Sequence, residues 1–402
     1  MTELSSSAPG TRRSSAAPTP VTALDIERLR EALVLAESGF GRTEPNPRVG
    51  CIIGLADGTV LGRGATQQAG HAHAEIMALR DAHALGRVVR GATAWVTLEP
   101  CAHHGRTPPC CDALIAAGLA RVVLAASDPF SAVNGQGTAR LRAAGIAVVD
   151  IGDSAAAGSD PALHDIRTAA REINVGFFSR IERGRPWVRM KIAASLDGRT
   201  GLDNGVSQWI TGEAARADGH AWRRRASAVL TGIGTVLEDN PRLDVRLVPT
   251  VLQPLRVVVD SRMQTPPAAQ LLARPGRGVW IYAAEDRPQQ RQALEAAGAA
   301  LRLLPGVGDK VDLVALMADL GARDINELHV EAGHKLNGSL LRAGLVDELL
   351  LYLAPRLIGP GRDLAALPAL QALSGTLDFH FEEAKMVGGD LRIRARRADR
   401  SD

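Results

Sequence analysis

Short apolar runs alternate with segments of helical periodicity between residues 22 and 152, and this alternation restricts the fold more than any other feature of the chain. Residues 25–38 place apolar side chains at helical spacing, with charged residues between them. The run RVGCIIGL at 48–55 is typical of a buried strand, and further helix-and-strand pairs follow it. Such a series predicts an α/β sandwich, in which helices cover a central sheet.

A helical stretch at 161–173 ends this series, and the segment NVGFFSRIERGRPWV at 174–188 breaks the rhythm. A second α/β series follows, with short apolar runs bounded by Gly, Pro and Asp that predict another sheet. At 402 residues the chain is long for one domain, and no internal repeat links its halves. We therefore predict two different α/β domains, at 22–175 and 185–398.

Residues 1–21 are rich in Ser, Ala and Pro and contain no continuous apolar run. They are predicted to form a disordered tail rather than a signal peptide. No stretch of the chain reaches the roughly 18 apolar residues that a membrane span needs. We therefore expect a cytoplasmic protein without membrane contact. A formal net charge of +3, without a dense basic run, also argues against a nucleic-acid partner.

Potential metal ligands gather in the first domain. An H-A-E unit places Glu75 two residues after His73, and the segment PCAHHGRTPPCC contains Cys101 and Cys110. A catalytic zinc commonly takes three protein ligands and leaves the fourth position to water. The histidine and both cysteines are expected at helix starts, where the dipole and free N–H groups stabilise thiolates. Glu75 would move protons between the attacking water and a leaving amine, as in nucleobase deaminases.

Each part of this pattern also has an ordinary explanation. A lone H-x-E at a helix entry is most often a cap, and Pro-Cys at a strand end is common, but their combination favours a metal site. Two alternatives stay open: a zinc ion that only stabilises the fold, and a deaminase of another nucleobase or of RNA with a non-catalytic second domain. The remaining cysteines, Cys51 and Cys111, are expected to be buried thiols, because cytosolic disulfides are rare.

Two segments of the first half resemble one enzyme family. The segments 97–119 (TLEPCAHHGRTPPCCDALIAAGL) and 44–54 (EPNPRVGCIIG) are similar to the deaminase domain of bifunctional riboflavin-biosynthesis deaminase/reductases. The resemblance implies a cytidine-deaminase-like αβα sandwich. It assigns His73, Cys101 and Cys110 as the zinc ligands and Glu75 as the catalytic proton shuttle. It also places Asn46, His103 and Arg106 near a pyrimidine ribosyl phosphate, and a guanidinium suits the phosphate.

One position departs from the family's usual pattern. A histidine often precedes the H-A-E unit in a G-x-H context, whereas this chain has Thr66 at that place and His71 nearer the unit. His71 could replace the missing contact, compete as a ligand or face solvent, and we expect it to face solvent. The departure concerns the substrate contacts and leaves the zinc ligands unchanged.

The second half offers weaker signals of its own. The stretch TGIGTVLEDNP at 231–241 has closely spaced glycines after an apolar strand, which can let a backbone approach phosphate. Leu237 stands where a Rossmann fingerprint would have its third glycine, so that fingerprint is absent. The stretch VEAGHKLNG at 330–338 offers a second strand-end turn with Gly333. From the residues alone, ordinary tight turns are the better explanation of both stretches.

Segments of this half nonetheless resemble, in the expected order, the reductase domain of the same family: 191–201, 207–212, 229–246 and 329–341. That domain is similar in fold to dihydrofolate reductase and uses NADPH without a metal or flavin. The resemblance implies these cofactor contacts: Ala193, Trp209, Thr235, Asp239, Ser261, Gly333, His334, Lys335, Leu336, Asn337, Gly338 and Ser339. It implies these substrate contacts: Ser207, Arg223, Leu243, Arg246 and Glu331. Lys191 is a further candidate contact near the reacting sugar.

The resemblance covers the chain from about residue 25 to 395 and implies a bifunctional enzyme. The first domain would hydrolytically deaminate 2,5-diamino-6-ribosylamino-4(3H)-pyrimidinone 5′-phosphate. The second would use NADPH to reduce the ribosyl group, giving 5-amino-6-(5-phosphoribitylamino)uracil. The expected partners are this small-molecule substrate and, because sandwich deaminases of this kind usually associate, other copies of the chain in a homo-oligomer. No residue is assigned as proton donor of the reductase or as the group that selects NADPH over NADH.

Overall fold

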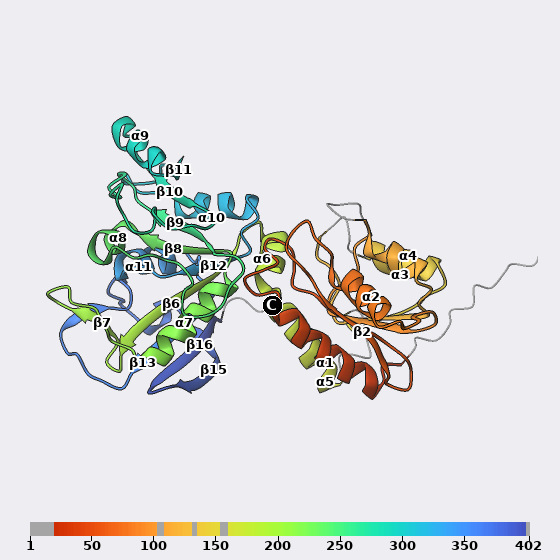
Figure 1. Cartoon of the computed structure of the whole chain (residues 1–402). Helices are drawn as coiled ribbons and strands as arrows, with labels where there is room; N and C mark the ends of the chain where they lie inside the picture. Colours follow the sequence, from red (N-terminus) through yellow and green to blue (C-terminus); the bar gives the residue numbers. More distant parts are fainter. Residues whose placement is uncertain (1–19, 103–107, 131–134, 153–159, 399–402) are drawn as a thin grey trace, which may run out of the picture.

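The computed structural model describes residues 20–102, 108–130, 135–152 and 160–398. Two α/β units, each built on its own sheet, lie on either side of helix α6 (Val175–Arg183) (Figure 1). Most of the predicted tail, residues 1–19, lies outside the described residues. In the part of the chain that the structure describes, no helix is both long and apolar enough to cross a membrane.

The first domain is built on a mixed sheet. Its strands are β1 (Gly50–Gly54), β2 (Val60–Ala65), β3 (Thr93–Val96), β4 (Arg121–Leu124) and β5 (Ala147–Asp150). Their order across the sheet is β2-β1-β3-β4-β5. β1 is antiparallel to both of its neighbours, whereas β3, β4 and β5 run parallel.

Helices cover both faces of this sheet. They are α1 (Ala23–Glu37), α2 (Ala74–Ala84), α3 (Cys110–Ala116), α4 (Gln136–Ala143) and α5 (Pro161–Ile173). α1 and α5 lie side by side on one face, and α2, α3 and α4 cover the other (Figure 1). The arrangement confirms the αβα sandwich that the sequence predicts.

Small residues bring α2 very close to β2. A Cβ atom added to Gly62 would lie 2.2 Å from the carbonyl oxygen of Ala78, and one added to Gly64 would lie 2.1 Å from that of Ala74. Both alanines are fully buried. Because no larger side chain separates the two backbones, close packing fixes the first turn of α2, and the polar residues on it, against the sheet.

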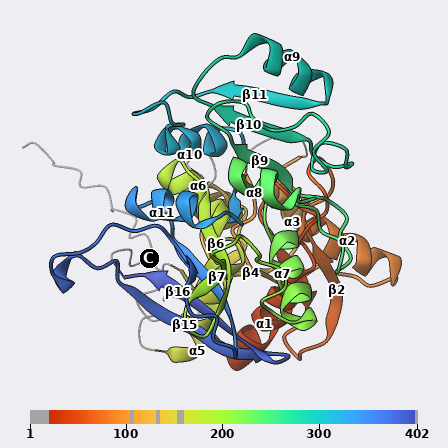
Figure 2. The same ribbon diagram turned by 90° about the vertical axis from the view of Figure 1, so that its left-hand side faces the viewer.

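The second domain is built on a larger sheet. Its strands are β6 (Trp187–Ser195), β8 (Ala228–Gly232), β9 (Leu255–Val259), β10 (Val279–Ala283), β11 (Ala299–Leu303), β12 (Glu327–Val330), β13 (Glu348–Ala354), β15 (Phe379–Val387) and β16 (Asp390–Arg397). Their order is β11-β10-β9-β8-β12-β6-β13-β16-β15, and β11 and β15 lie at opposite ends (Figure 2). Neighbouring strands run parallel from β11, at one end of this order, as far as β13. β16 is antiparallel to β13, and β15 is antiparallel to β16.

The rest of this domain consists of helices and one small separate sheet. The helices are α7 (Glu213–Arg225), α8 (Ile233–Asp239), α9 (Pro288–Ala296), α10 (Leu313–Ala322), α11 (His334–Arg342) and the 3₁₀ turn η1 (Leu373–Gly375). β7 (Arg199–Leu202) pairs antiparallel with β14 (Gly361–Asp363). The apolar core of the main sheet includes Val188, Leu230, Val257, Leu328 and Leu350, all fully buried.

The predicted junction contains a regular helix, and one expectation about local structure is wrong. Most of the segment 174–188 forms α6, which buries Phe177 and Phe178 in the first domain's core. The predicted turn at Gly333 is instead the N-terminal cap of α11, so residues 334–339 are helical. Gly333 suggested a tight turn, but its extended backbone caps the helix that follows.

Candidate active sites

Three predicted zinc ligands meet at the start of α2. His73 is the N-cap residue of α2, and Cys110 is the first residue of α3. The Nδ1 atom of His73 lies 3.6 Å from the sulfur of Cys101 and 3.3 Å from that of Cys110. One ligand atom from each residue lies within 4.8 Å of the others. Cys101 is not at a helix start as expected, but its sulfur accepts the Cys110 backbone N–H at 3.3 Å, at the N-terminus of α3.

This donor set fits zinc. Around a tetrahedral zinc ion, Zn–N and Zn–S bonds of ordinary length place a nitrogen and a sulfur about 3.6 Å apart, close to the separations found here. A hydrogen bond from the Cys110 thiol holds the pKa of Cys101 well below its usual range, and this favours a thiolate at that position. Two sulfurs and one nitrogen would leave the fourth position of a catalytic zinc open.

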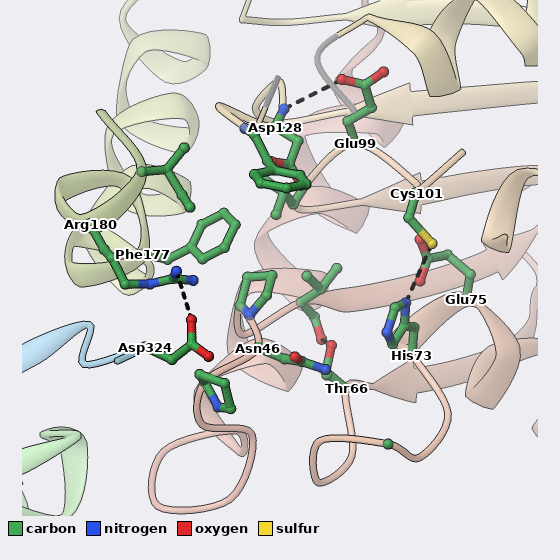
Figure 3. Close-up of a pocket in the computed structure, with 17 residues that line it drawn as sticks. Asn46, Thr66, His73, Glu75, Glu99, Cys101, Asp128, Phe177, Arg180 and Asp324 are labelled. Atoms are coloured by element: carbon green, nitrogen blue, oxygen red, sulfur yellow. Dashed lines mark hydrogen bonds and ion pairs between the residues drawn. The ribbon is translucent and has the colours of Figure 1, made fainter. Parts of the chain in front are cut away.

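Glu75 lies in the first turn of α2, two residues after His73, and points toward Cys101 (Figure 3). Its side chain is buried, and this burial, together with the charge on Cys101, raises the pKa of Glu75 to about 6. A carboxyl group in that range can both accept and donate a proton near neutral pH. The structure therefore places an acid–base group beside the metal-ligand cluster and in the same cavity.

The cavity has a volume of about 520 Å³ and lies between the two domains (Figure 3). Asn46 and Thr66 line it near His73, so the structure brings these predicted residues to the cluster. His71 is exposed to solvent and does not line the cavity. The predicted contacts His103 and Arg106 lie outside the described residues.

Several cavity residues were missed in the sequence. Glu99 accepts N–H groups from Gly135 and Thr138, both at 3.0 Å, and so holds the start of α4 near the cavity. Burial raises the pKa of Asp128, another lining residue, to about 7. Glu99 could have been predicted as a residue of this site, because it stands in the segment TLEPC directly before Cys101 and its proline. Arg180 and Asp324 also line the cavity, but no sequence pattern indicates that α6 and the second domain reach this site.

A second cavity, of about 570 Å³, lies within the second domain. It is lined by five residues that the sequence singled out: Lys191, Trp209, Arg223, Arg246 and Glu331. The other predicted substrate contacts, Ser207 and Leu243, are not among the described residues that line it. Leu243 is almost fully buried.

Charges in the second cavity are strongly coupled. Arg223 donates to both carboxylate oxygens of Glu331, one of them at 2.9 Å, and the ammonium group of Lys191 lies 3.9 Å from Glu331. Burial acts to raise the pKa of Glu331, but Arg223 and Lys191 hold it well below its usual range. Burial lowers the pKa of His220, a lining residue that was not predicted, to about 4. Its place one helical turn before Arg223 was a usable signal.

The predicted cofactor residues lie mainly where strands end and helices begin. β8 and β12 are parallel neighbours, and α8 and α11 begin directly beyond them. A Cβ atom added to Gly333 would lie 3.7 Å from Thr235 Oγ1, so the two helix starts are adjacent. A Cβ atom added to Gly234 would meet nothing within 4 Å. Adjacent helix N-termini with an open glycine backbone suit the phosphates of a dinucleotide.

Other predicted cofactor residues lie on nearby elements. Ser261 follows β9, the strand beside β8, and Ala193 is on β6, the strand beside β12. Asp239 ends α8. Trp209 lies on the wall of the second cavity and is largely exposed under the guanidinium of Arg216.

Comparisons with known proteins give the same two-part division. The family model for the cytidine and deoxycytidylate deaminase zinc-binding region matches residues 24–126, and the model for the RibD C-terminal domain matches residues 186–392. The riboflavin biosynthesis protein RibD of Escherichia coli (strain K12) is 43% identical over 376 residues, covering 90% of this chain and 96% of the relative.

Solved structures agree over nearly the whole chain. RibD of Acinetobacter baumannii (form 1) superposes with a TM-score of 0.82 at 36% identity, covering 93% of this chain and 99% of the other. The diaminohydroxyphosphoribosylaminopyrimidine deaminase/5-amino-6-(5-phosphoribosylamino)uracil reductase of Thermotoga maritima gives 0.80 at 29% identity, with the same coverage. The zinc-ligand cluster and the match along both domains lead to one conclusion: this chain belongs to the RibD family of riboflavin biosynthesis proteins.

Proposed function

We propose that this chain is a bifunctional enzyme that first deaminates 2,5-diamino-6-ribosylamino-4(3H)-pyrimidinone 5′-phosphate and then reduces its ribosyl group with NADPH. The product is 5-amino-6-(5-phosphoribitylamino)uracil. The observation that carries the proposal is the cluster of His73, Cys101 and Cys110 with Glu75 in one cavity, on a chain whose second domain holds a separate arginine-lined cavity. The two domains are proposed to span 22–175 and 185–398, with most of α6 between them.

For the first reaction, bound zinc supplies Lewis-acid activation of the attacking water. His73, Cys101 and Cys110 would hold the ion, and Glu75 takes a proton from the water and delivers it to the departing amine. Burial of Glu75 keeps its pKa at about 6, so it can do both. Asn46 faces the pyrimidine, and His103 and Arg106 are proposed contacts of the ribose phosphate.

For the second reaction, bound NADPH supplies the hydride. The proposed cofactor contacts are those at β6, β9, α8 and α11, together with Trp209. Arg223 is already paired with Glu331, whereas the side chain of Arg246 is 39% exposed and contacts Asp244. Arg246 is therefore the better clamp for the substrate phosphate, and the Arg223–Glu331 pair orients groups around the sugar, beside Lys191. Ser207 and Leu243 are kept as proposed contacts outside the cavity wall.

The function is tested by coupled turnover. The diaminopyrimidine substrate is supplied with and without NADPH, and ammonia release and NADPH absorbance are followed separately. Ammonia should appear without NADPH, and NADPH oxidation should follow deamination. Turnover of cytidine or adenosine in place of this substrate would contradict the proposal.

Metal removal should separate the two activities. Dialysis against a chelator is expected to lower ammonia release at least about 100-fold, because water loses its Lewis-acid activation. NADPH oxidation with the deaminated intermediate should continue at its original rate, since the second cavity contains no part of the cluster. Added zinc should restore ammonia release. Loss of both activities would instead indicate that the metal stabilises the whole fold.

Arg246→Met should weaken substrate binding in the reductase alone. Loss of a charge-assisted contact with phosphate costs roughly 2 kcal/mol, so the reductase KM is expected to rise about 30-fold with little change in kcat. Arg291→Met on α9, which removes a surface ion pair with Asp286, is the control and should leave KM unchanged. An unaltered KM in Arg246→Met would remove this residue from the phosphate site.

We also propose that the chain forms a homo-oligomer and works in the cytoplasm. β15 is an edge strand of the large sheet, and Phe381 and Met386 on it are 77% and 62% exposed. Edge strands with exposed apolar side chains favour pairing with another chain. All four cysteines are free thiols, in keeping with a reducing compartment. The mass measured by sedimentation tests the association.

A further inference from the structure

The loop at 43–48 forms one wall of the first cavity. Pro45, Asn46 and Pro47 all line it, and Asn46 lies near the metal-ligand cluster (Figure 3). Within the loop, the backbone N–H of Asn46 donates to Thr43 at 2.9 Å. The same segment also bonds to residues of the second domain.

The carboxylate of Glu44 is held by the second domain. Ser227, directly before β8, donates its hydroxyl to Glu44 Oε2 at 2.6 Å. Asn326, directly before β12, donates its amide to the same oxygen at 3.1 Å and to the carbonyl of Pro45 at 2.9 Å. Ser227 and Asn326 are at least nine-tenths buried. The backbone next to Asn46 is therefore fixed by groups that belong to the reductase.

Arg48 ties the far end of the loop to both domains. Its backbone N–H donates to Asn174 Oδ1 of the first domain at 2.7 Å, whereas its guanidinium reaches the second. Its guanidinium donates to Glu44 at 2.7 Å and to Glu327, the first residue of β12, at 2.6 Å. It also donates to the carbonyl oxygen of Arg225, at the end of α7, at 2.7 Å. The Arg48 side chain is only 3% exposed, so water screens these contacts little.

Asn326 also holds a second wall of the cavity. The side-chain amide oxygen of Asn326 accepts the Nε–H of Arg180 on α6 at 2.7 Å. Arg180 in turn pairs with Asp324 at 3.0 Å. Both Arg180 and Asp324 line the cavity. One amide side chain of the reductase domain thus contacts the loop before Asn46 through its nitrogen and the α6 wall through its oxygen.

We infer that Asn326 is a positioning residue for deamination, so that the deaminase cavity is completed by the reductase domain. The inference rests on the proposed function, because it assigns the substrate-binding wall of that cavity to Asn46. Asn326 touches neither the metal-ligand cluster nor the second cavity. Its removal should therefore change how the substrate is held, and leave the acid–base chemistry of Glu75 in place.

The test compares Asn326→Leu with wild type in both reactions. We expect the KM of deamination to rise about tenfold with kcat within about twofold, since a loosened wall weakens binding rather than proton transfer. The reductase constants with the deaminated intermediate and the zinc content should stay unchanged. Tyr282→Phe, which removes a buried hydrogen bond to Asp319 elsewhere in the same domain, is the matched control and should leave both KM values unaltered. An unchanged deaminase KM, or an equal loss in both reactions, would overturn the inference.

Two further measurements keep the test decisive. If Asn326→Leu does not fold, Ser227→Ala can replace it, because it removes one donor to Glu44. This variant should raise the deaminase KM about threefold. An unchanged KM would count against the inference. Hydrogen exchange of the 43–48 amides needs no turnover and should become faster in either variant. If wild type releases no ammonia, the proposed function fails. Faster exchange in the variant than in wild type would still support the anchoring by Asn326. Equal exchange in the two proteins would refute it.

Discussion

A Glu75→Gln enzyme should release ammonia about a thousandfold more slowly than wild type, because the amide cannot take a proton from water or return it to the amine. Gln has nearly the same shape, so His73, Cys101 and Cys110 should retain zinc. NADPH oxidation with the deaminated intermediate should be unaffected, because Glu75 lies outside the second cavity. Ammonia release, zinc content and NADPH absorbance measured on one preparation check the three outcomes.

The control for this variant is Asp81→Asn, which makes the same change of charge on the same helix. Asp81 accepts the backbone N–H of Arg63 at 2.8 Å and does not line the cavity. It should keep nearly full deaminase activity. Full activity in Glu75→Gln would mean that the cluster is a structural metal site, since such a site has no use for the carboxylate.

Glu327→Gln should lower the free energy of unfolding by about 3–5 kcal/mol, the usual cost of breaking a buried ion pair. Glu327 is 1% exposed and contacts three guanidinium groups, those of Arg48, Arg189 and Arg225, at 2.6 to 2.9 Å. Without its charge, these arginines would remain buried and less compensated. Urea unfolding at pH 7 measures the loss.

The same pairing predicts how stability depends on pH. Burial acts to raise the pKa of Glu327, but Arg225, Arg48 and Arg189 lower it from 4.5 to about 2. A depressed folded-state pKa stabilises the protein above the unfolded value, and this contribution is lost as pH falls. The difference between wild type and Glu327→Gln should therefore be full above about pH 5 and shrink between pH 4.5 and 2.

Glu238→Gln is the matched control for this stability prediction. Glu238 pairs with Arg362 at 2.6 Å, but its side chain is 52% exposed. Exposed ion pairs contribute about 0–1 kcal/mol, so this variant should unfold almost like wild type. A loss below about 1 kcal/mol in Glu327→Gln would show that the buried cluster is not a major source of stability.

The sequence predicts the parts of the fold that carry strong local patterns. Apolar runs such as 48–55 and the periodic helix at 161–173 are where the structure has them. β2 was missed because its glycines, needed for contact with α2, remove the apolar pattern of a strand. β15 was missed because most of its side chains are exposed at the sheet edge.

The residues of the candidate sites also differ in whether a local sequence pattern reveals them. His73, Glu75, Cys101 and Cys110 stand in a compact motif whose chemistry can be recognised from residue types and spacing. Arg180, Asp324 and Asn326 could not be predicted, because their roles depend on which surfaces of the two domains meet. The proposed cofactor contacts rest on resemblance, and several of them lie where α8 and α11 begin.

The buried charges between the domains have a consequence for the history of such genes. A chain cut near residue 174 would give one fragment with Arg48 and no Glu327, and another with Glu327 and no Arg48. Arg48 would keep its pairing with Glu44, and Glu327 would keep Arg189 and Arg225. Each fragment would nonetheless lose one contact of a buried charge cluster. Separation of the two halves into independent genes would therefore carry a cost in stability at this surface, which favours keeping them on one chain.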